Sequence, residues 1–269
     1  MNLKKTLLSL AVMASFITGC TQQKVLVLYY SQTGTTQVVA EELQKQLGAD
    51  IDSIVAVEPY SGDFQATIQR GQREMQSGET PALKPLHVNI ADYDVIFIGY
   101  PIWFGTYAMP IATLVKENDF AGKTVVPFCT FGSGGLNTST EALKAALPKA
   151  KVQTGYGVRT ARILAVGKEL DRFLKANGYK RGVVAKLPDY SAQLPVTDEE
   201  TAIFNAACSS YQFPLGTPQT VGKRVTDDST DYQFVVKGRG MNGEESISTI
   251  YVTVGKGEGA KPEFTEVVR

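Results

Sequence analysis

Two consecutive segments near the start of the chain decide the fold: VLVLYY at residues 25–30 and SQTGTT at residues 31–36. The first is short and uninterrupted by charged or small polar residues. Such a run is typical of a parallel strand buried on both faces, because a strand with one wet face would alternate apolar and polar positions. The second is polar, contains a glycine and is followed by apolar residues at helical spacing. Together they predict a strand, a tight loop and a helix.

The loop SQTGTT has the chemistry of an anion site. A strand-to-helix junction directs unpaired backbone N–H groups and the positive end of a helix dipole at one point. Gly34 permits a tight turn, and further donors come from the hydroxyls of Ser31, Thr33, Thr35 and Thr36. The loop lacks the lysine of a Walker A loop, and no GxGxxG of a dinucleotide site follows the strand. We interpret it as a phosphate site; the alternative is a polar turn with an ordinary helix cap.

Strands and helices alternate through the first 180 residues. Strand-like apolar runs recur at residues 51–57, 94–99, 124–129 and 152–158. Helical patterns are found at residues 38–47, 111–117, 142–147 and 168–177. We expect the first helix to end at Gly48, and Thr138 with Glu141 to form a capping box ahead of residues 142–147. This alternation predicts an α/β fold with a doubly wound, five-stranded parallel sheet, whose ligands bind beyond the carboxyl ends of the strands.

The chain resembles the flavodoxin family over about residues 24–179. The family's phosphate loop reads Ser or Thr, any residue, Thr, Gly, any residue, Thr, and SQTGTT fits this pattern at every position. The resemblance implies that FMN is the cofactor and that its phosphate is bound without cationic side chains. The residues expected to bind it are Ser31, Gln32, Thr33, Gly34, Thr35 and Thr36.

The resemblance also implies that two later loops contact the flavin ring. One is YPIWFGTY at residues 100–107, with the only tryptophan of the chain, and the other is TFGSGG at residues 130–135. An aromatic face and close backbone approach suit a planar ring. The expected ring contacts are Pro101, Ile102, Trp103, Phe104, Gly105, Phe131, Gly132, Ser133 and Gly134. The alternatives are core packing or an inter-domain contact for Trp103, and a flexible turn for the glycines.

Other residues within residues 24–179 are expected to have structural roles rather than to bind a ligand. Glu58-Pro59-Tyr60 and Arg73-Glu74 are similar to segments of longer, often secreted flavodoxin-like proteins, and we expect them to fix the second crossover rather than touch flavin. Arg159 and Arg162 flank the end of the fifth strand. Salt bridges at the surface or between domains are their expected role, and contact with a ligand carboxylate or a quinone is the alternative.

The character of the sequence changes after Tyr179. Residues 180–195 are polar and irregular, as in a linker. Residues 196–269 are expected to form a small α+β domain, a helix and a four-stranded antiparallel meander, with some similarity to cystatin-like or NTF2-like modules. A capping box of Thr197 and Glu200 opens the helix, and one helix face holds Ala202, Ile203, Ala206 and Ala207. The strand candidates are residues 219–226, 232–238, 247–254 and 263–268, with an Asn-Gly turn at 241–243.

The first twenty residues are expected to be an export signal. Lys4 and Lys5 precede an apolar run that is too short to span a bilayer and that ends in ITGC at residues 17–20. This ending resembles a bacterial lipobox, so we interpret residues 1–19 as a lipoprotein signal peptide and Cys20 as the lipidated residue. A plain secretion signal with an incidental cysteine is the alternative. By the rule for such lipoproteins, Thr21 in place of aspartate favours the outer membrane. No acidic cluster follows the cysteine, so we expect the periplasmic face of a Gram-negative outer membrane.

Composition argues against several other classes of function. The 27 basic and 27 acidic residues balance and form no long charged run, so nothing indicates a nucleic-acid partner. His87 is the only histidine, and no GxSxG, HExxH or CxxC is present, so nothing indicates a hydrolytic triad or a metal site. We expect His87 to lie in a loop. Cys129 and Cys208 are expected to stay free, with a disulfide as the alternative.

These features favour an FMN-binding, lipid-anchored protein that transfers electrons in the cell envelope. Its partner is an unidentified redox protein or small acceptor there, and its only contact with the membrane is the anchor. An FMN-dependent reductase of quinones or other small acceptors, and a non-redox binding protein on a flavodoxin scaffold, are the alternatives. No side chain is assigned a catalytic role.

Overall fold

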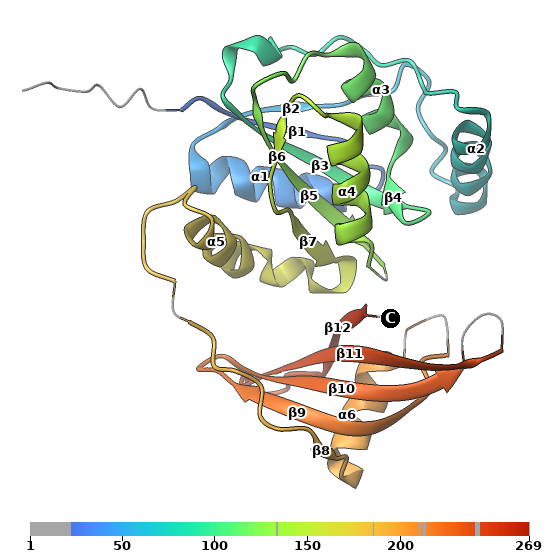
Figure 1. Ribbon diagram of the computed structural model, residues 1–269, viewed down its shortest axis with the longest axis vertical. Coiled ribbons are helices and arrows are strands. Elements are labelled where there is room, and N and C mark those ends of the chain that lie inside the picture. Colours follow the sequence, from blue (N-terminus) through green and yellow to red (C-terminus); the bar gives the residue numbers. More distant parts are fainter. Residues whose placement is uncertain are drawn as a thin grey trace, which may run out of the picture.

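The computed structural model describes residues 23–132, 134–184, 186–209, 211, 214–239 and 243–268. The predicted signal peptide, Cys20 and Ser133 lie outside these residues. The described part of the chain contains two separate sheets, one parallel along its main path and one antiparallel (Figure 1). No helix among the described residues is long and apolar enough to cross a bilayer.

The first sheet has the strand order of a doubly wound fold. Its parallel strands are β1 (Val25–Tyr29), β2 (Asp50–Ser53), β3 (Val95–Trp103), β5 (Thr124–Phe131), β6 (Lys151–Val152) and β7 (Tyr156–Arg159). They are arranged β2-β1-β3-β5, and both β6 and β7 pair with β5. The strand order reverses between β1 and β3, which is where such folds bind ligands. The predicted fold class is confirmed, with the fifth strand divided into two pieces.

Helices cover both faces of this sheet. Residues of α1 (Thr35–Leu47) and α5 (Val166–Ala176) pack on one face. Residues of α3 (Met109–Glu117) and α4 (Leu136–Ala146) pack on the other. The helix α2 (Phe64–Ser77) stands apart at the edge of the domain, beside the short strand β4 (Thr106–Tyr107) (Figure 1). Two short 3₁₀ helices, η1 (Ile90–Asp92) and η2 (Thr160–Ala165), precede β3 and α5.

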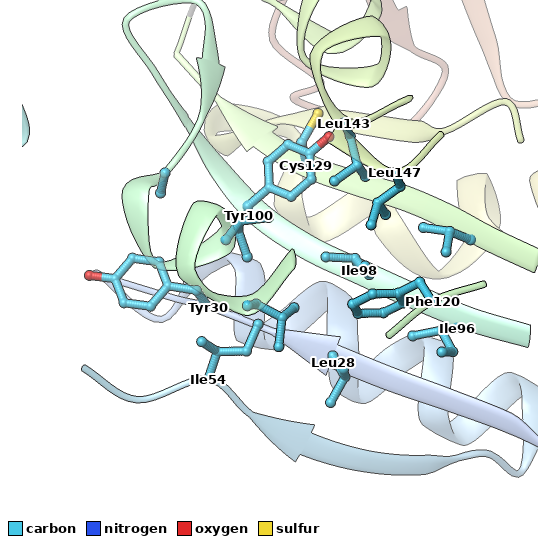
Figure 2. Packing of buried hydrophobic residues seen from close by; sticks show 14 of the residues in the cluster. Leu28, Tyr30, Ile54, Ile96, Ile98, Tyr100, Phe120, Cys129, Leu143 and Leu147 are labelled. Carbon is cyan, nitrogen blue, oxygen red and sulfur yellow. The ribbon is translucent and has the colours of Figure 1, made fainter. Parts of the chain in front are cut away.

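Successive side chains of the central strands fill two cores. In β3, Ile96 and Ile98 belong to the cluster under α3 and α4, which Figure 2 shows in part. Val95 and Phe97 belong to the cluster under α1 and α5. Each such side chain contributes about 1.5–3 kcal/mol when fully buried. Burial on both faces explains why these strands read as uninterrupted apolar runs.

The predicted fifth strand is divided into β6 and β7 because of the strand beside it, β5. Residues 124–125 pair with β6 and residues 128–131 pair with β7, so three residues of the outer strand stand opposite two residues of β5. One of those two is Pro127, which has no N–H to donate. A Cβ at Gly155 would lie 2.8 Å from the Pro127 carbonyl oxygen, so the extra residue is accommodated at a glycine. The second strand is also shorter than predicted and ends at Ser53.

The predicted capping box of Thr138 and Glu141 is wrong. The helix α4 begins at Leu136, its N-cap is Gly135, and no side chain caps it. The loop reverses on two glycines with positive φ, so the helix starts earlier than the Thr-Glu pattern indicates. Thr138 and Glu141 are exposed positions within the helix.

The second sheet is an antiparallel meander with one added strand. It consists of β8 (Leu194–Pro195), β9 (Thr217–Val225), β10 (Ser229–Arg239), β11 (Glu245–Gly255) and β12 (Glu263–Val268). The strands follow the order β12-β11-β10-β9-β8, so the four predicted strands are present and β8 makes a fifth. Of the predicted turn, Met241 and Asn242 lie outside the described residues.

The helix α6 (Asp198–Cys208) packs against the second sheet. Thr197 and Glu200 form the predicted capping box. The predicted buried face is partly wrong, because Ala202 and Ala206 are exposed and the buried apolar residues of the helix are Phe204 and Ala207. The large Phe204 ring, which packs against Phe234, decides the orientation of the helix. Cys129 and Cys208 are both free, as expected.

Gly99 of β3 has no room for a side chain. It pairs directly with Phe128 of β5, and a Cβ at Gly99 would lie 2.1 Å from Cζ of that ring. We expect Gly99→Ala to lower the free energy of unfolding by about 1–3 kcal/mol, because the buried ring must move in a packed core. Urea denaturation followed by circular dichroism measures this. Gly62→Ala is the control, since nothing lies within 4 Å of its Cβ position; equal effects of the two variants would contradict the packing argument.

Candidate cofactor site

The loop between β1 and α1 lies at the carboxyl edge of the sheet, where the strand order reverses. Gly34 has φ of +85° and is the N-cap of α1, so the N-cap residue has no side chain to bond the first N–H groups of the helix. Among the described residues, no acceptor receives the backbone N–H of Thr35 or Thr36, the first residues of the helix. The space beside Gly34 is open, with no atom within 4 Å of a Cβ placed there. Free N–H groups and the helix dipole therefore face an open space that fits a phosphate.

The hydroxyl groups of the loop have different roles. Thr33 and Thr35 place their Oγ1 atoms 3.4 Å apart on the exposed side of the loop. Ser31 Oγ accepts a hydrogen bond of 3.3 Å from the Gln37 N–H, within the first turn of α1. Thr36 is 1% exposed and its hydroxyl is 2.8 Å from that of Thr130 in β5. That pair fixes the first turn of α1 to the neighbouring strand.

Gln32 attaches the loop to the second crossover, which is the segment between β2 and β3 that contains α2. Its Oε1 accepts a hydrogen bond of 2.5 Å from the Tyr30 hydroxyl, and its Nε2 donates to the Ser61 carbonyl at 2.9 Å. Burial raises the pKa of Tyr30 above its ordinary value, so the hydroxyl remains a donor. A pocket of about 350 Å³ opens beside these groups, lined by Tyr29, Tyr30, Ser31, Gln32, Gln37, Ser53, Ile54, Val55, Ala56, Pro59 and Tyr60.

The first predicted ring loop is a β-hairpin rather than an irregular loop. Pro101, Ile102 and Trp103 continue β3, and Trp103 pairs with Thr106 of β4. The turn consists of Phe104 at φ +52° and Gly105 at φ +81°. Two positive φ values in a two-residue turn match the twist of a hairpin, although a phenylalanine rarely adopts one. Strained residues of this kind cluster at ligand sites.

Trp103 lies within an aromatic cluster. Its ring meets those of Tyr60 and Tyr30 edge-on, with centroids 5.0 and 5.8 Å away. It is only partly buried, so both core packing and ring contact remain compatible with its position. Trp103 as a flavin contact therefore stays a prediction.

The second crossover supports this cluster from outside. Arg70 of α2 stacks over the Tyr60 ring at 4.0 Å, and its Nε donates to Glu74 at 2.8 Å. The Tyr60 hydroxyl donates to the other oxygen of Glu74 at 2.5 Å. A Cβ at Gly71 would lie 3.2 Å from the Phe104 ring, so α2 also packs on the hairpin turn. The segment thus fixes the crossover, as expected, with Arg70 rather than the exposed Arg73 as the partner of Glu74.

The second predicted ring loop lies next to the first. Phe131 ends β5 and is buried, whereas Gly132 and Gly134 face open space. A Cβ at Gly135 would lie 2.9 Å from Ile102, which places the two loops in contact. All three predicted loops therefore converge on one edge of the sheet, as a single cofactor would require.

The remaining candidates lie elsewhere. His87 is exposed, in a loop, with its Nδ1 3.0 Å from Asp52. Among the described residues no group of three His, Cys, Asp or Glu side chains is arranged to hold a metal ion. Arg159 and Arg162 both contact β12 of the second sheet. The expected salt bridges are found for Arg162, which pairs with Glu169 and Glu263, whereas Arg159 bonds to backbone carbonyls instead.

A family of known proteins matches the part of the chain that forms the first sheet. The family described as Flavodoxin matches residues 24–165, more than half of the chain. The chain belongs to the flavodoxin family. This membership supports the prediction of FMN as the cofactor.

Three solved structures are similar to part of the chain. A candidate flavoprotein from Bacteroides eggerthii is 35% identical, with a TM-score of 0.50, over 56% of this chain and 97% of its own. Another, from Bacteroides uniformis, is 31% identical with a TM-score of 0.50, over 55% and 98%. A flavoprotein from Lactobacillus acidophilus, crystallised with FMN, is 24% identical with a TM-score of 0.47, over 56% and 98%. None of these three matches extends over the whole chain.

Two supports of the flavodoxin site escaped the sequence patterns. Thr130 is the first residue of TFGSGG, and the sequence patterns assign it no role, although a threonine among buried strand residues must find a partner. Arg70 lies on a mostly polar helix among other charged residues. Only the fold shows that Thr130 bonds to Thr36 of the phosphate loop and that Arg70 stacks on Tyr60.

The hydroxyl pair of Thr36 and Thr130 gives a direct test of how the phosphate loop is held. Thr130→Val leaves the buried Thr36 hydroxyl without its partner, which we expect to cost about 1–3 kcal/mol. The double variant with Thr36→Val replaces both hydroxyls by methyl groups and is expected to recover most of that loss. Denaturation of both single variants and the double variant measures the coupling; additive losses would show that the pair does not act as a unit.

Proposed function

We propose that this protein binds FMN at the carboxyl edge of its first sheet and transfers electrons in the cell envelope. One observation carries the proposal: among the described residues the first two N–H groups of α1, next to Gly34, have no acceptor, and two further loops converge beside them. Bound FMN would supply electron transfer at its ring. The chain's own task is to bind and orient the cofactor and to limit access to it.

The loops divide this task by their chemistry. Backbone N–H groups of Thr35 and Thr36 would hold the phosphate, with the Thr33 and Thr35 hydroxyls as further donors. No lysine or arginine occurs at residues 30–36, so the dianion would be bound by dipoles rather than by counter-charges. The partly buried Trp103 and the open backbone at Gly132 would border the ring.

The protein's place in the cell is part of the same proposal. The signal-like first nineteen residues and Cys20 support export and lipid anchoring, with the periplasmic face of an outer membrane as the expected location. The redox partner would be a protein or a small acceptor of that compartment. Steady-state turnover of a quinone would instead favour a reductase.

Substitution of Gly34 tests the cofactor site. We expect Gly34→Val to weaken FMN binding at least tenfold, which is about 1.4 kcal/mol, because a side chain enters the phosphate space and disfavours the positive φ. Fluorescence titration of FMN into the apoprotein measures the Kd, and quenching of the single tryptophan reports whether the ring lies near Trp103.

A matched control separates strain from site occupancy. Gly122 also has a positive φ and open space beside it, but it lies before β5, at the opposite edge of the sheet. Gly122→Val is expected to leave FMN affinity unchanged. Unaltered affinity in Gly34→Val would refute the phosphate loop, and colourless wild-type protein that rejects added FMN would favour the non-redox alternative.

Substitution of Cys20 tests the anchor. In a Gram-negative host we expect the natural chain in the detergent-soluble membrane fraction and Cys20→Ala in the soluble fraction, because the lipid is attached through that sulfur. Cys208→Ala is the control and should stay with the membrane. Recovery of the unchanged chain in the soluble fraction would contradict lipid anchoring.

A further inference from the structure

Arg159 joins the two sheets at the cofactor edge. It is the last residue of β7 and only 9% exposed. Its Nε donates a hydrogen bond of 2.6 Å to the carbonyl of Gly132, in the second ring loop. Its Nη1 lies 3.4 Å from the carbonyl of Phe264 in β12. One guanidinium therefore contacts both a cofactor loop and the C-terminal sheet.

The charge of Arg159 has no anionic partner among the described residues. Its Cζ lies 4.2 Å from the centre of the Phe264 ring, which is stacked on Tyr211. By contrast, Arg162, on the next turn, is ion-paired with Glu169 and lies 3.9 Å from Glu263. Burial lowers the pKa of Arg159 relative to an exposed arginine, which reflects the cost of holding a cation there. A buried cation without a counter-charge, beside a predicted cofactor site, indicates a functional role.

Hydrogen bonds hold the C-terminal sheet in the position that this contact needs. Arg162 donates to the Thr265 hydroxyl at 3.1 Å, and Thr265 lies 3.3 Å from Thr253. Thr253 donates to Asp231 at 2.9 Å, and Asp231 accepts two hydrogen bonds from Arg224. The chain of contacts runs from η2 across four strands of the second sheet, from β12 to β9. It fixes β12, and with it the ring and carbonyl of Phe264, against Arg159.

We propose that Arg159 couples docking of the C-terminal sheet to the bound cofactor: with β12 in place, its guanidinium fixes the Gly132 carbonyl and its charge favours the reduced, more negatively charged flavin. The inference rests on the proposed FMN function. It assigns the C-terminal domain a task, which is to set the reduction potential of a cofactor that it does not itself bind. Arg159 acts here as a positioning residue, through the loop and through its field.

The test measures oxidised FMN affinity and reduction potential in the full chain. In Arg159→Gln, reduced FMN is expected to bind at least tenfold more weakly relative to oxidised FMN, which is equivalent to 59 mV for a one-electron couple. Arg159→Lys keeps the charge, so its affinity for reduced relative to oxidised FMN should be close to that of the unchanged chain. Arg172→Gln removes an exposed charge from α5 and should have no effect.

The outcomes separate the two proposals. Failure of the wild-type chain to bind FMN would overturn the proposed function and the coupling with it. Normal FMN binding with equal potentials in Arg159→Gln and Arg172→Gln would overturn the coupling alone.

A second measurement uses the unmodified chain and so does not depend on how the variants fold. Because coupling between two sites is reciprocal, FMN should also favour docking. Saturating FMN is expected to slow hydrogen exchange at residues 263–268 at least threefold. Unchanged exchange there, with FMN bound, would contradict the coupling.

Discussion

Burial of the parallel sheet on both of its faces is the constraint on which the rest of the structure depends. The central strands carry apolar side chains toward two separate cores, so polar groups have few places within them. Where one occurs, as at Thr130, it is satisfied by a partner, Thr36, from the adjoining helix. Groups that bind a ligand are therefore confined to the strand ends. There the loops lie at one edge, with α1 supplying free backbone donors at the reversal of strand order.

The position of these loops depends on residues that contact no expected ligand. Tyr30 orients Gln32, which attaches the phosphate loop to the second crossover. Arg70 and Glu74 hold Tyr60 against Trp103 from the outer side. The second crossover thus holds the hairpin of β3 and β4 in place. Because α2 also packs against Phe104, the strained turn there is tolerated.

The sequence patterns correctly predicted the features that depend on interactions between residues close together in the chain. The β1 run and its loop were recognisable because strand, turn and helix start are specified within twelve residues, and the Thr197 cap because its partner is three residues away. Features decided by distant residues were not predictable. Pro127 divides the strand beside it, two glycines override the Thr138 pattern, and Phe204 rather than the alanines orients α6. The extension of β3 through Trp103 likewise depends on β4, and the support from Arg70 depends on the fold of the crossover.

The direction of β1 determines which way an anchored molecule would face. Lys24 precedes the amino end of β1 and the phosphate loop follows its carboxyl end. The five residues of the strand rise about 3.3 Å each, so the two ends are about 17 Å apart. Four peptide steps link Cys20 to Lys24, a reach of at most about 14 Å. A lipid on Cys20 would hold the amino edge of the sheet toward the bilayer, and the opposite edge would look into the aqueous space. Electron exchange would then occur with a diffusing partner rather than with a quinone in the lipid.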